Sequence, residues 1–124
     1  MSYSVCRVPW QEAESLLKDV REKVFICERR IPKNIEFDRT DNSAFHMLVC
    51  DDHSQTPIAT GRISCAGEIS RIAVLMEFRG AGIDKIIMQG LFRVAKDLAL
   101  DEVYIYSPLD NVSYFIEQNF SPVG

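Results

Sequence analysis

The sequence lacks three features: a run of eighteen apolar residues, a basic balance, and a basic start followed by an apolar stretch. A helix needs roughly 18 or more apolar residues to cross a bilayer, so no membrane partner is expected. The formal net charge of -4 and the isoelectric point near 5.1 argue against a nucleic-acid partner. The opening Met-Ser-Tyr-Ser-Val-Cys-Arg does not resemble a signal peptide, so we expect a cytoplasmic protein.

Cysteine is sparse, and the sequence contains no C-x-x-C pair. The 4 cysteines are Cys6, Cys27, Cys50 and Cys65. They indicate neither a zinc site nor a disulfide framework, so we expect no metal and interpret them as reduced, buried thiols. The sequence also lacks internal repeats, low-complexity tracts and linkers. Its 124 residues therefore suit a single domain over residues 1–124.

Hydrophobic residues make up 47% of the chain, and their spacing changes between helical and strand-like. The pattern predicts strands at 44–50, 58–65, 68–75 and 103–107, helices at 9–31, 83–99 and 110–118, and an acidic loop that ends near residue 43. The helix at 83–99 joins two strand segments, and such a crossover makes them parallel. Because the first two strands form a hairpin, the predicted fold is an α/β structure with a mixed sheet.

The segment Arg79-Gly80-Ala81-Gly82 lies between a predicted buried strand and a predicted helix. The first N–H groups of a helix are unpaired, and together with the positive end of the helix dipole they attract an anion. Glycines in this position also make ordinary tight turns. The loop by itself is consistent with either a turn or a phosphate-binding cradle.

The order strand, Arg79-x-x-Gly82-x-Asp84, helix resembles the acetyl-CoA signature of the GNAT acyltransferases. That signature usually reads Gln or Arg, two residues, Gly, one residue, then Gly or Ala. The resemblance implies that the loop amides hold the diphosphate of the coenzyme. This sequence departs from the signature at its last place, where Asp84 stands.

Other stretches are similar to one branch of this family, the YjcF and ElaA type. They are Val20 to Pro32, Glu36-Phe37-Asp38-Arg39-Thr40-Asp41, Ala44-Phe45-His46, Thr60 to Ile63, Ser70 to Leu75 and Tyr114 to Phe120. The resemblance covers essentially the whole chain. It implies a three-layer α/β/α fold whose mixed central sheet splays into a V between the strand ending near Leu75 and the strand at Val103. Relatives continue through further strands, so the C-terminal strands are expected to be truncated.

The resemblance also implies an activity. Acetyl-CoA would enter the splay as co-substrate, and its acetyl group would pass by direct attack to an amine of a small molecule or peptide, without a metal. A backbone N–H near Val74 would stabilise the developing oxyanion. The residues expected to bind acetyl-CoA are Ile72, Ala73, Val74, Arg79, Gly80, Ala81, Gly82, Ile83, Asp84, Lys85, Asn111 and Phe115.

Glu68 is the first candidate for the general base that the attacking amine requires. It lies eleven residues before Arg79, which is the spacing of the base in the histone-acetyltransferase branch. The alternative interpretation is an exposed residue at the start of a strand. Glu28, Glu36 and Asp38 remain further base candidates, or form only a solvated acidic loop.

Phe115 occupies the place where many relatives carry a tyrosine that protonates the leaving thiolate. Tyr114 or Tyr106 is therefore the expected acid. Asp84 is expected both to cap its helix and to weaken coenzyme binding, because a carboxylate repels a nearby phosphate. His46 lies among apolar neighbours and is interpreted as a core-edge residue rather than a catalytic one.

Arg62 and Arg71 lie within predicted strands, where a charge needs a partner. They either pair with Glu28, Glu36 or Asp38, or bind a carboxylate of the acceptor. Glu28, Arg62 and Arg71 are accordingly the candidates for substrate binding.

Two other functions stay open. The departures at Asp84, at Phe115 and at the C-terminus favour a catalytically weak CoA-binding or interaction module. The acyl-homoserine lactone synthases use similar residue types to Arg21, Phe25, Glu36, Asp38, Asp41 and Arg62. A sheet that stops soon after Phe120 leaves the strand at 103–107 without a neighbour, so a homodimer is expected.

Overall fold

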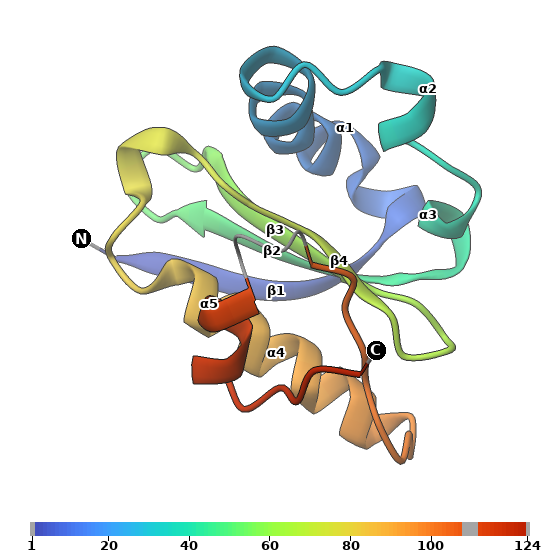
Figure 1. The fold of residues 1–124 in the computed structure, drawn as a ribbon. Coiled ribbons are helices and arrows are strands. Elements are labelled where there is room, and N and C mark those ends of the chain that lie inside the picture. Colours follow the sequence, from blue (N-terminus) through green and yellow to red (C-terminus); the bar gives the residue numbers. More distant parts are fainter. Residues whose placement is uncertain (1, 108–111, 124) are drawn as a thin grey trace.

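The computed structural model describes residues 2–107 and 112–123. The described strands are β1 (Tyr3–Pro9), β2 (Phe45–Asp51), β3 (Pro57–Ile63) and β4 (Ile69–Val74), in the order β1-β2-β3-β4 with antiparallel neighbours. The helices are α1 (Trp10–Arg21), the π-helix η1 (Glu22–Glu28), α2 (Lys33–Glu36), α3 (Thr40–Ser43), the 3-10 helix η2 (Met76–Phe78), α4 (Ile83–Asp97) and α5 (Val112–Glu117). Figure 1 shows α1 to α3 on one face of the sheet and α4 and α5 on the other, which makes three layers.

The strands predicted at 44–50, 58–65 and 68–75 are confirmed as β2, β3 and β4. The sequence does not predict β1, which pairs with β2 along its whole length at one edge of the sheet. Most side chains of β1 are exposed. Because neither face of this edge strand is fully buried, its residues show no clear apolar alternation, and periodicity cannot reveal it.

The structure contradicts the predicted strand at 103–107. Among the described residues, this segment makes one parallel bridge, between Glu68 and Tyr104. The N–H of Ile69 donates to the carbonyl of Tyr104 at 2.9 Å, and the N–H of Tyr104 donates to the carbonyl of Gly67 at 3.0 Å. Beyond the bridge the segment leaves β4, so the mixed character of the sheet is limited to this contact.

The predicted helices are confirmed with changes at their ends. The helix predicted at 9–31 is α1 continued by η1, and the helix predicted at 83–99 is α4. The last predicted helix corresponds to α5, while its expected first residues, 110 and 111, lie outside the described residues. The expected acidic loop instead contains α2 and α3. Within the described part of the chain, no helix is both long and apolar enough to cross a membrane.

The prediction of buried thiols is wrong. All the cysteines are free, and Cys6, Cys27 and Cys65 are exposed, while Cys50 is half-buried. Cys6 is exposed because it lies on the edge strand β1.

The core joins α4 closely to the sheet. Ile83, Ile87, Leu91 and Val94 recur at helical spacing on α4, and all are buried. Opposite them, β3 carries Gly61. A Cβ atom built on Gly61 would lie 2.4 Å from Cγ2 of Ile87 and 3.1 Å from Cδ1 of Leu91. The absence of a side chain at this position therefore sets how closely α4 approaches β3.

Gly61→Ala should lower the free energy of unfolding by about 1–3 kcal/mol, because the added methyl overpacks the contact with Ile87. Urea denaturation measures the loss. The matched control is Gly90→Ala, whose Cβ would lie 2.7 Å from Cε of Met47, the movable end of a flexible side chain. Alanine is also the better helix former, so this control should change stability by less than about 0.5 kcal/mol. Equal losses in both variants would contradict the proposed packing constraint.

Candidate functional site

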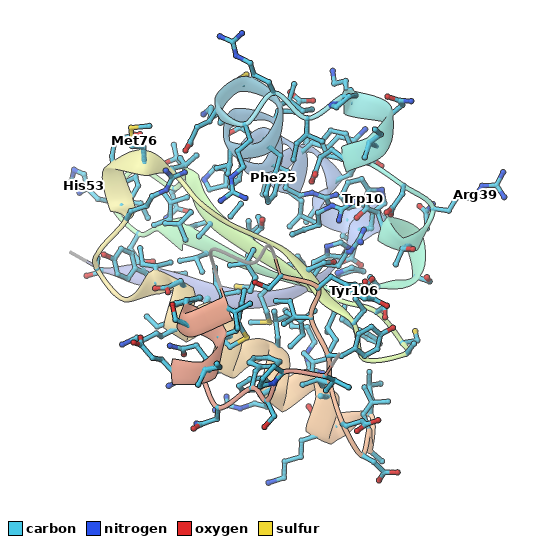
Figure 2. The ribbon with its side chains drawn as sticks, viewed as in Figure 1. Trp10, Phe25, Arg39, His53, Met76 and Tyr106 are labelled. Atoms are coloured by element: carbon cyan, nitrogen blue, oxygen red, sulfur yellow. The ribbon has the colours of Figure 1, made fainter. Side chains whose placement is uncertain are left out.

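A cavity of about 680 Å³ lies where β4 and segment 103–107 part. This volume is within the range of small-molecule sites. Figure 2 shows the side chain of Phe25, a residue of η1, between that helix and the sheet. The lining comes from η1, α2, β4 and the residue before it, the stretch from η2 to the start of α4, segment 103–107 and α5. It includes Phe25, Arg29, Glu36, Glu68, Ser70, Arg71, Ile72, Ala73, Val74, Phe78, Arg79, Gly80, Ile83, Asp84, Ile105, Tyr106, Tyr114 and Phe115. Residues from distant parts of the sequence therefore surround one space.

The N-terminus of α4 adjoins the cavity. Gly80 and Gly82 have φ of 83° and 80°, in the left-handed region that glycine adopts readily. A Cβ atom at either position would meet no heavy atom within 4 Å, so the glycines serve the backbone conformation and leave open space beside the loop. Because Ile83 begins a helix of 15 residues, unpaired N–H groups face this region. The loop and helix fit the phosphates of a coenzyme.

Asp84 opposes that fit. It is the second residue of α4, and Gly82 is the N-cap, with no side-chain cap hydrogen bond. The predicted capping role is therefore wrong. The carboxylate instead accepts a hydrogen bond of 2.5 Å from the hydroxyl of Tyr114 in α5.

Tyr114 is constrained by this contact. Burial and the hydrogen bond to Asp84 raise the pKa of the Tyr114 phenol well above its usual range. A phenol with a raised pKa holds its proton more tightly and is a weaker acid. In this arrangement Tyr114 is a poorer candidate than the sequence suggests for protonating a leaving thiolate.

Arg79 does not extend freely toward a phosphate. Its Nη1 and Nη2 donate to the two carboxylate oxygens of Glu28 at 2.7 and 2.6 Å, and its Nε donates to the carbonyl of Val74 at 2.9 Å. The hydrogen bond from Arg79 lowers the pKa of Glu28. Glu28 is thus a weak proton acceptor, and it contacts Arg79 at the start of the loop of residues 79–82, the candidate coenzyme loop, rather than lining the cavity.

Beneath α1, a buried ion network forms the wall of the cavity near α2. Its centre is Arg21, which is 1% exposed and which the sequence did not mark as a structural centre. Arg21 Nε donates to Glu36 at 2.7 Å, and Nη1 donates to Asp41 at 2.7 Å. The guanidinium also lies 4.9 Å from the ring of Phe37 and 5.4 Å from that of Trp10, within range of a cation–π attraction.

Arg62 and Arg71 belong to the same network, so their predicted pairing with acidic residues is confirmed. Nη1 of Arg62 donates to Asp38 at 2.8 Å and to Asp41 at 3.0 Å. Arg71 lies 3.2 Å from Glu36 and 3.3 Å from Asp38. Arg62 is 2% exposed and does not line the cavity, so its position gives no support to the prediction that it contacts an acceptor.

The network shifts the pKa values of Glu36 and Asp41 in opposite directions. Burial raises the pKa of Glu36, and Arg21 and Arg71 offset only part of this effect. Burial also acts on Asp41, but hydrogen bonds and charges of Arg21 and Arg62 outweigh it and lower the pKa.

His46 is confirmed as a core residue. It is 2% exposed, its Nε2 lies 3.0 Å from the carbonyl of Asp41, and its ring lies 5.4 Å from that of Trp10. Burial lowers the pKa of His46, which keeps the imidazole neutral at physiological pH.

A β-bulge lies at the cavity. Arg71 and Ile72 of β4 are opposite the single residue Gly61 of β3. Arg71 has φ of 57°, a left-handed conformation that is strained for a residue with a side chain. Both bulge residues line the cavity.

Glu68 and Tyr106 remain the catalytic candidates least committed to other contacts. Glu68 is half-buried directly before β4, and the described residues offer its carboxylate no ion pair or side-chain hydrogen bond. Tyr106 is 81% exposed and packs edge-on against Tyr104, with ring centroids 5.8 Å apart. Both residues line the cavity.

Most predicted coenzyme residues line the cavity. Ile72, Ala73, Val74, Arg79, Gly80, Ile83, Asp84 and Phe115 do so. Ala81, Gly82 and Lys85 belong to the loop and helix start without lining it, and Asn111 lies outside the described residues. Within residues 2–107 and 112–123, no group of His, Cys, Asp and Glu side chains is arranged to hold a metal ion.

Comparisons with known proteins add an independent line of evidence. No protein-family model matches the chain. The chain is 38% identical over 90 residues to a protein described as the uncharacterized N-acetyltransferase YjcF of Bacillus subtilis (strain 168). This match covers 68% of the chain but 63% of YjcF, so the chain spans less than two thirds of that relative's length.

Two solved structures share the fold. An acyl-CoA N-acyltransferase from Pseudomonas aeruginosa has a TM-score of 0.86 and 22% identity, over 98% of this chain and 90% of the other. Escherichia coli ElaA has a TM-score of 0.82 and 17% identity, over 94% of this chain and 86% of the other.

The three layers, the parting of β4 from segment 103–107 and the helix N-terminus beside the cavity define an α/β fold of the acyltransferase type. The chain belongs to the GNAT superfamily of N-acetyltransferases.

Arg21→Met should lower the free energy of unfolding by about 3 kcal/mol, the low end of the cost of breaking a buried ion pair, because Glu36 and Asp41 lose their shared cation and keep only Arg71 and Arg62. Chemical denaturation at pH 8 measures the loss. The loss should shrink at pH 5, because a buried carboxyl group that has lost one of its cations takes up a proton more readily. The control is Arg39→Met, since Arg39 is exposed and projects away from the molecule in Figure 2. If both variants lose an equally small free energy of unfolding, the network does not hold together the cavity wall near α2.

Proposed function

We propose that the chain is an N-acyltransferase that moves an acetyl group from acetyl-CoA to an amine of a small molecule or peptide. The main support is the cavity of about 680 Å³. It is lined by the coenzyme loop beyond the C-terminal end of β4 and by Glu68, directly before its start. A donor that runs along β4 would therefore reach from the loop toward a free carboxylate.

The open edge of β4 supports this placement of the donor. After the bridge at Glu68 and Tyr104, no further backbone hydrogen bond joins the described part of segment 103–107 to β4. An extended arm with amide groups can pair with such an edge. Gly80, Gly82 and the first N–H groups of α4 would receive the phosphates.

The reaction follows from the positions of the candidate groups. Acetyl-CoA supplies a thioester whose acetyl carbon is open to attack. The amine nitrogen forms a bond to that carbon, Glu68 accepts the proton that the nitrogen loses, and the carbon–sulfur bond breaks. Tyr106 is the better-placed donor of a proton to the sulfur, because Tyr114 is bonded to Asp84.

A catalytically weak CoA-binding or interaction module is the second candidate. Asp84 favours it, because a carboxylate at the second residue of α4 faces the region that the phosphates would occupy. Lys85, next in sequence, and Arg79, which lines the same cavity, carry positive charges that would offset part of its effect. Measuring coenzyme binding and acetyl transfer on one sample separates the two functions.

The assembly also remains a proposal. We expect a homodimer because segment 103–107 exposes two aromatic residues, Tyr104 at 41% and Tyr106 at 81%. A second copy that covers these rings would bury apolar surface. The single domain and the cytoplasmic location expected from the sequence likewise remain predictions.

Glu68→Gln should lower turnover of an amine acceptor by about 10²–10⁴ at neutral pH, the usual share of a general base. The melting temperature should hardly change, because Glu68 has no ion pair among the described residues. The control is Glu77→Gln, an exposed residue of η2 that does not line the cavity. A large drop in melting temperature with activity retained would show that Glu68 is a structural residue.

Asp84→Asn should raise the affinity for CoA about tenfold, because it removes the repulsion of a phosphate while keeping the shape of the side chain. Calorimetry with CoA measures the change. Tyr114→Phe is the matched control, since it deletes the hydrogen bond of 2.5 Å but leaves the charge of Asp84. That control should not raise the affinity. Unchanged affinity in Asp84→Asn would mean that the carboxylate lies outside the field of the phosphates.

A further inference from the structure

The ion pair of Glu28 and Arg79 joins the end of η1 to the loop that leads into α4. Glu28 is the last residue of η1, and Arg79 is the first residue of the coenzyme loop. Both terminal nitrogens of Arg79 bond the carboxylate, at 2.6 and 2.7 Å, while Nε bonds the carbonyl of Val74 at the end of β4. One guanidinium thus connects a helix, a strand end and a loop. We call this contact the clasp.

The clasp is poorly suited to a role in global stability. The side chains of Arg79 and Glu28 are 38% and 31% exposed. Pairs that remain in contact with water contribute little to the free energy of unfolding, even though a bidentate geometry fixes direction well. We therefore look for the role of the clasp in the residues that it positions.

The loop beyond Arg79 has little else to hold it. Gly80 and Gly82 contact nothing at their Cβ positions, and Ala81 is exposed. Packing resumes only at Ile83, which is 1% exposed. Among the described residues, the clasp supplies the side-chain hydrogen bonds that fix the start of this loop.

We propose that Glu28 is a positioning residue for the acyl donor: by holding Arg79, it fixes residues 79–82 in the arrangement that receives the donor phosphates. This inference rests on the proposed function, because it assumes that the loop binds CoA. It assigns to Glu28 a role other than base or acceptor contact. It also makes Arg79 a structural element of the cradle rather than a direct ligand of phosphate.

The alternative role of Arg79 predicts the opposite sign for one variant. If Arg79 instead binds the phosphate directly, Glu28 only competes with the phosphate for Arg79. Glu28→Gln then frees Arg79 and raises the affinity for CoA. If the clasp positions the loop, Glu28→Gln lowers that affinity by about tenfold, since the loop must then be ordered on binding. Calorimetry with CoA on the full chain distinguishes these two results.

A double-mutant cycle completes the test. We expect Arg79→Gln to match the loss in Glu28→Gln, and the double variant to lose no more than either single one. The exchanged pair Glu28→Arg with Arg79→Glu should recover part of the affinity. Additive losses, or a gain in Glu28→Gln, would overturn the proposal.

Glu22→Gln is the matched control. Glu22 begins η1 and pairs with Lys33 at 3.4 Å, so the variant makes the same change of charge on the same helix without touching the loop. It should leave CoA affinity within twofold of the wild type. All variants should keep their melting temperatures, and acetyl transfer, where found, should show a higher KM for acetyl-CoA with little change in kcat.

Failure of the clasp and failure of the proposed function give different results. If the wild type does not bind CoA, the proposed function fails, and the clasp is tested by hydrogen exchange at the amides of residues 79–82. Glu28→Gln should then speed exchange at these amides relative to Glu22→Gln. Equal exchange rates in the two variants would overturn the clasp itself.

Discussion

The parting of two chain segments after one parallel bridge governs the architecture of this protein. At the base of β4 the N–H of Ile69 donates to the carbonyl of Tyr104 and the N–H of Tyr104 donates to the carbonyl of Gly67, and the segment that follows Tyr104 then turns away. Had the pairing continued, the backbone of β4 would be satisfied on both sides and no cavity would exist. Because it stops, one edge of β4 stays open, and the bulge at Arg71 presents its residues to the resulting space.

Different kinds of interaction hold the two walls of the cavity. On the side of α2, three cations and three carboxylates, namely Arg21, Arg62, Arg71, Glu36, Asp38 and Asp41, form a balanced network that is largely withdrawn from water. Breaking such a network lowers the free energy of unfolding strongly, and its hydrogen bonds fix the orientation of each side chain. On the other side, residues 79–82 depend on the exposed contact of Arg79 with Glu28. The wall near α2 is therefore held by buried ion pairs, and the wall near α4 by a pair that water reaches.

Local patterns predicted much of the fold and part of the site. The apolar spacing of α4 and the hairpin of β2 and β3 each reflect one buried face, which periodicity records. The pairing of Arg62 and Arg71 with acidic residues followed from the cost of an unpaired charge in a sheet. The edge strand β1 escaped detection, since exposed residues are under no such constraint. The exposed Cys6 on that strand was misjudged for the same reason.

Two other contacts between distant residues could not be predicted. Glu28 and Arg79 are 51 positions apart, and nothing local to either residue indicates the other. The hydrogen bond from Tyr114 to Asp84 likewise depends on how α5 packs across α4. A capping role for Asp84 was the better local inference, because acidic residues at helix starts commonly cap. The structure differs because Gly82, two places earlier, is already the N-cap, so Asp84 lies within the first turn.

Gly61 has a consequence for electrostatics as well as for packing. The close contact of its backbone with Ile87 and Leu91 fixes the axis of α4 against β3. The positive end of that helix lies one turn away from Ile87, beside the cavity. Gly61 carries a hydrogen atom where alanine would carry a methyl group. This small side chain on β3 thereby determines the direction of the dipole of α4. The position of the positive helix end, where we propose that the phosphates bind, is therefore set by a residue that does not line the cavity.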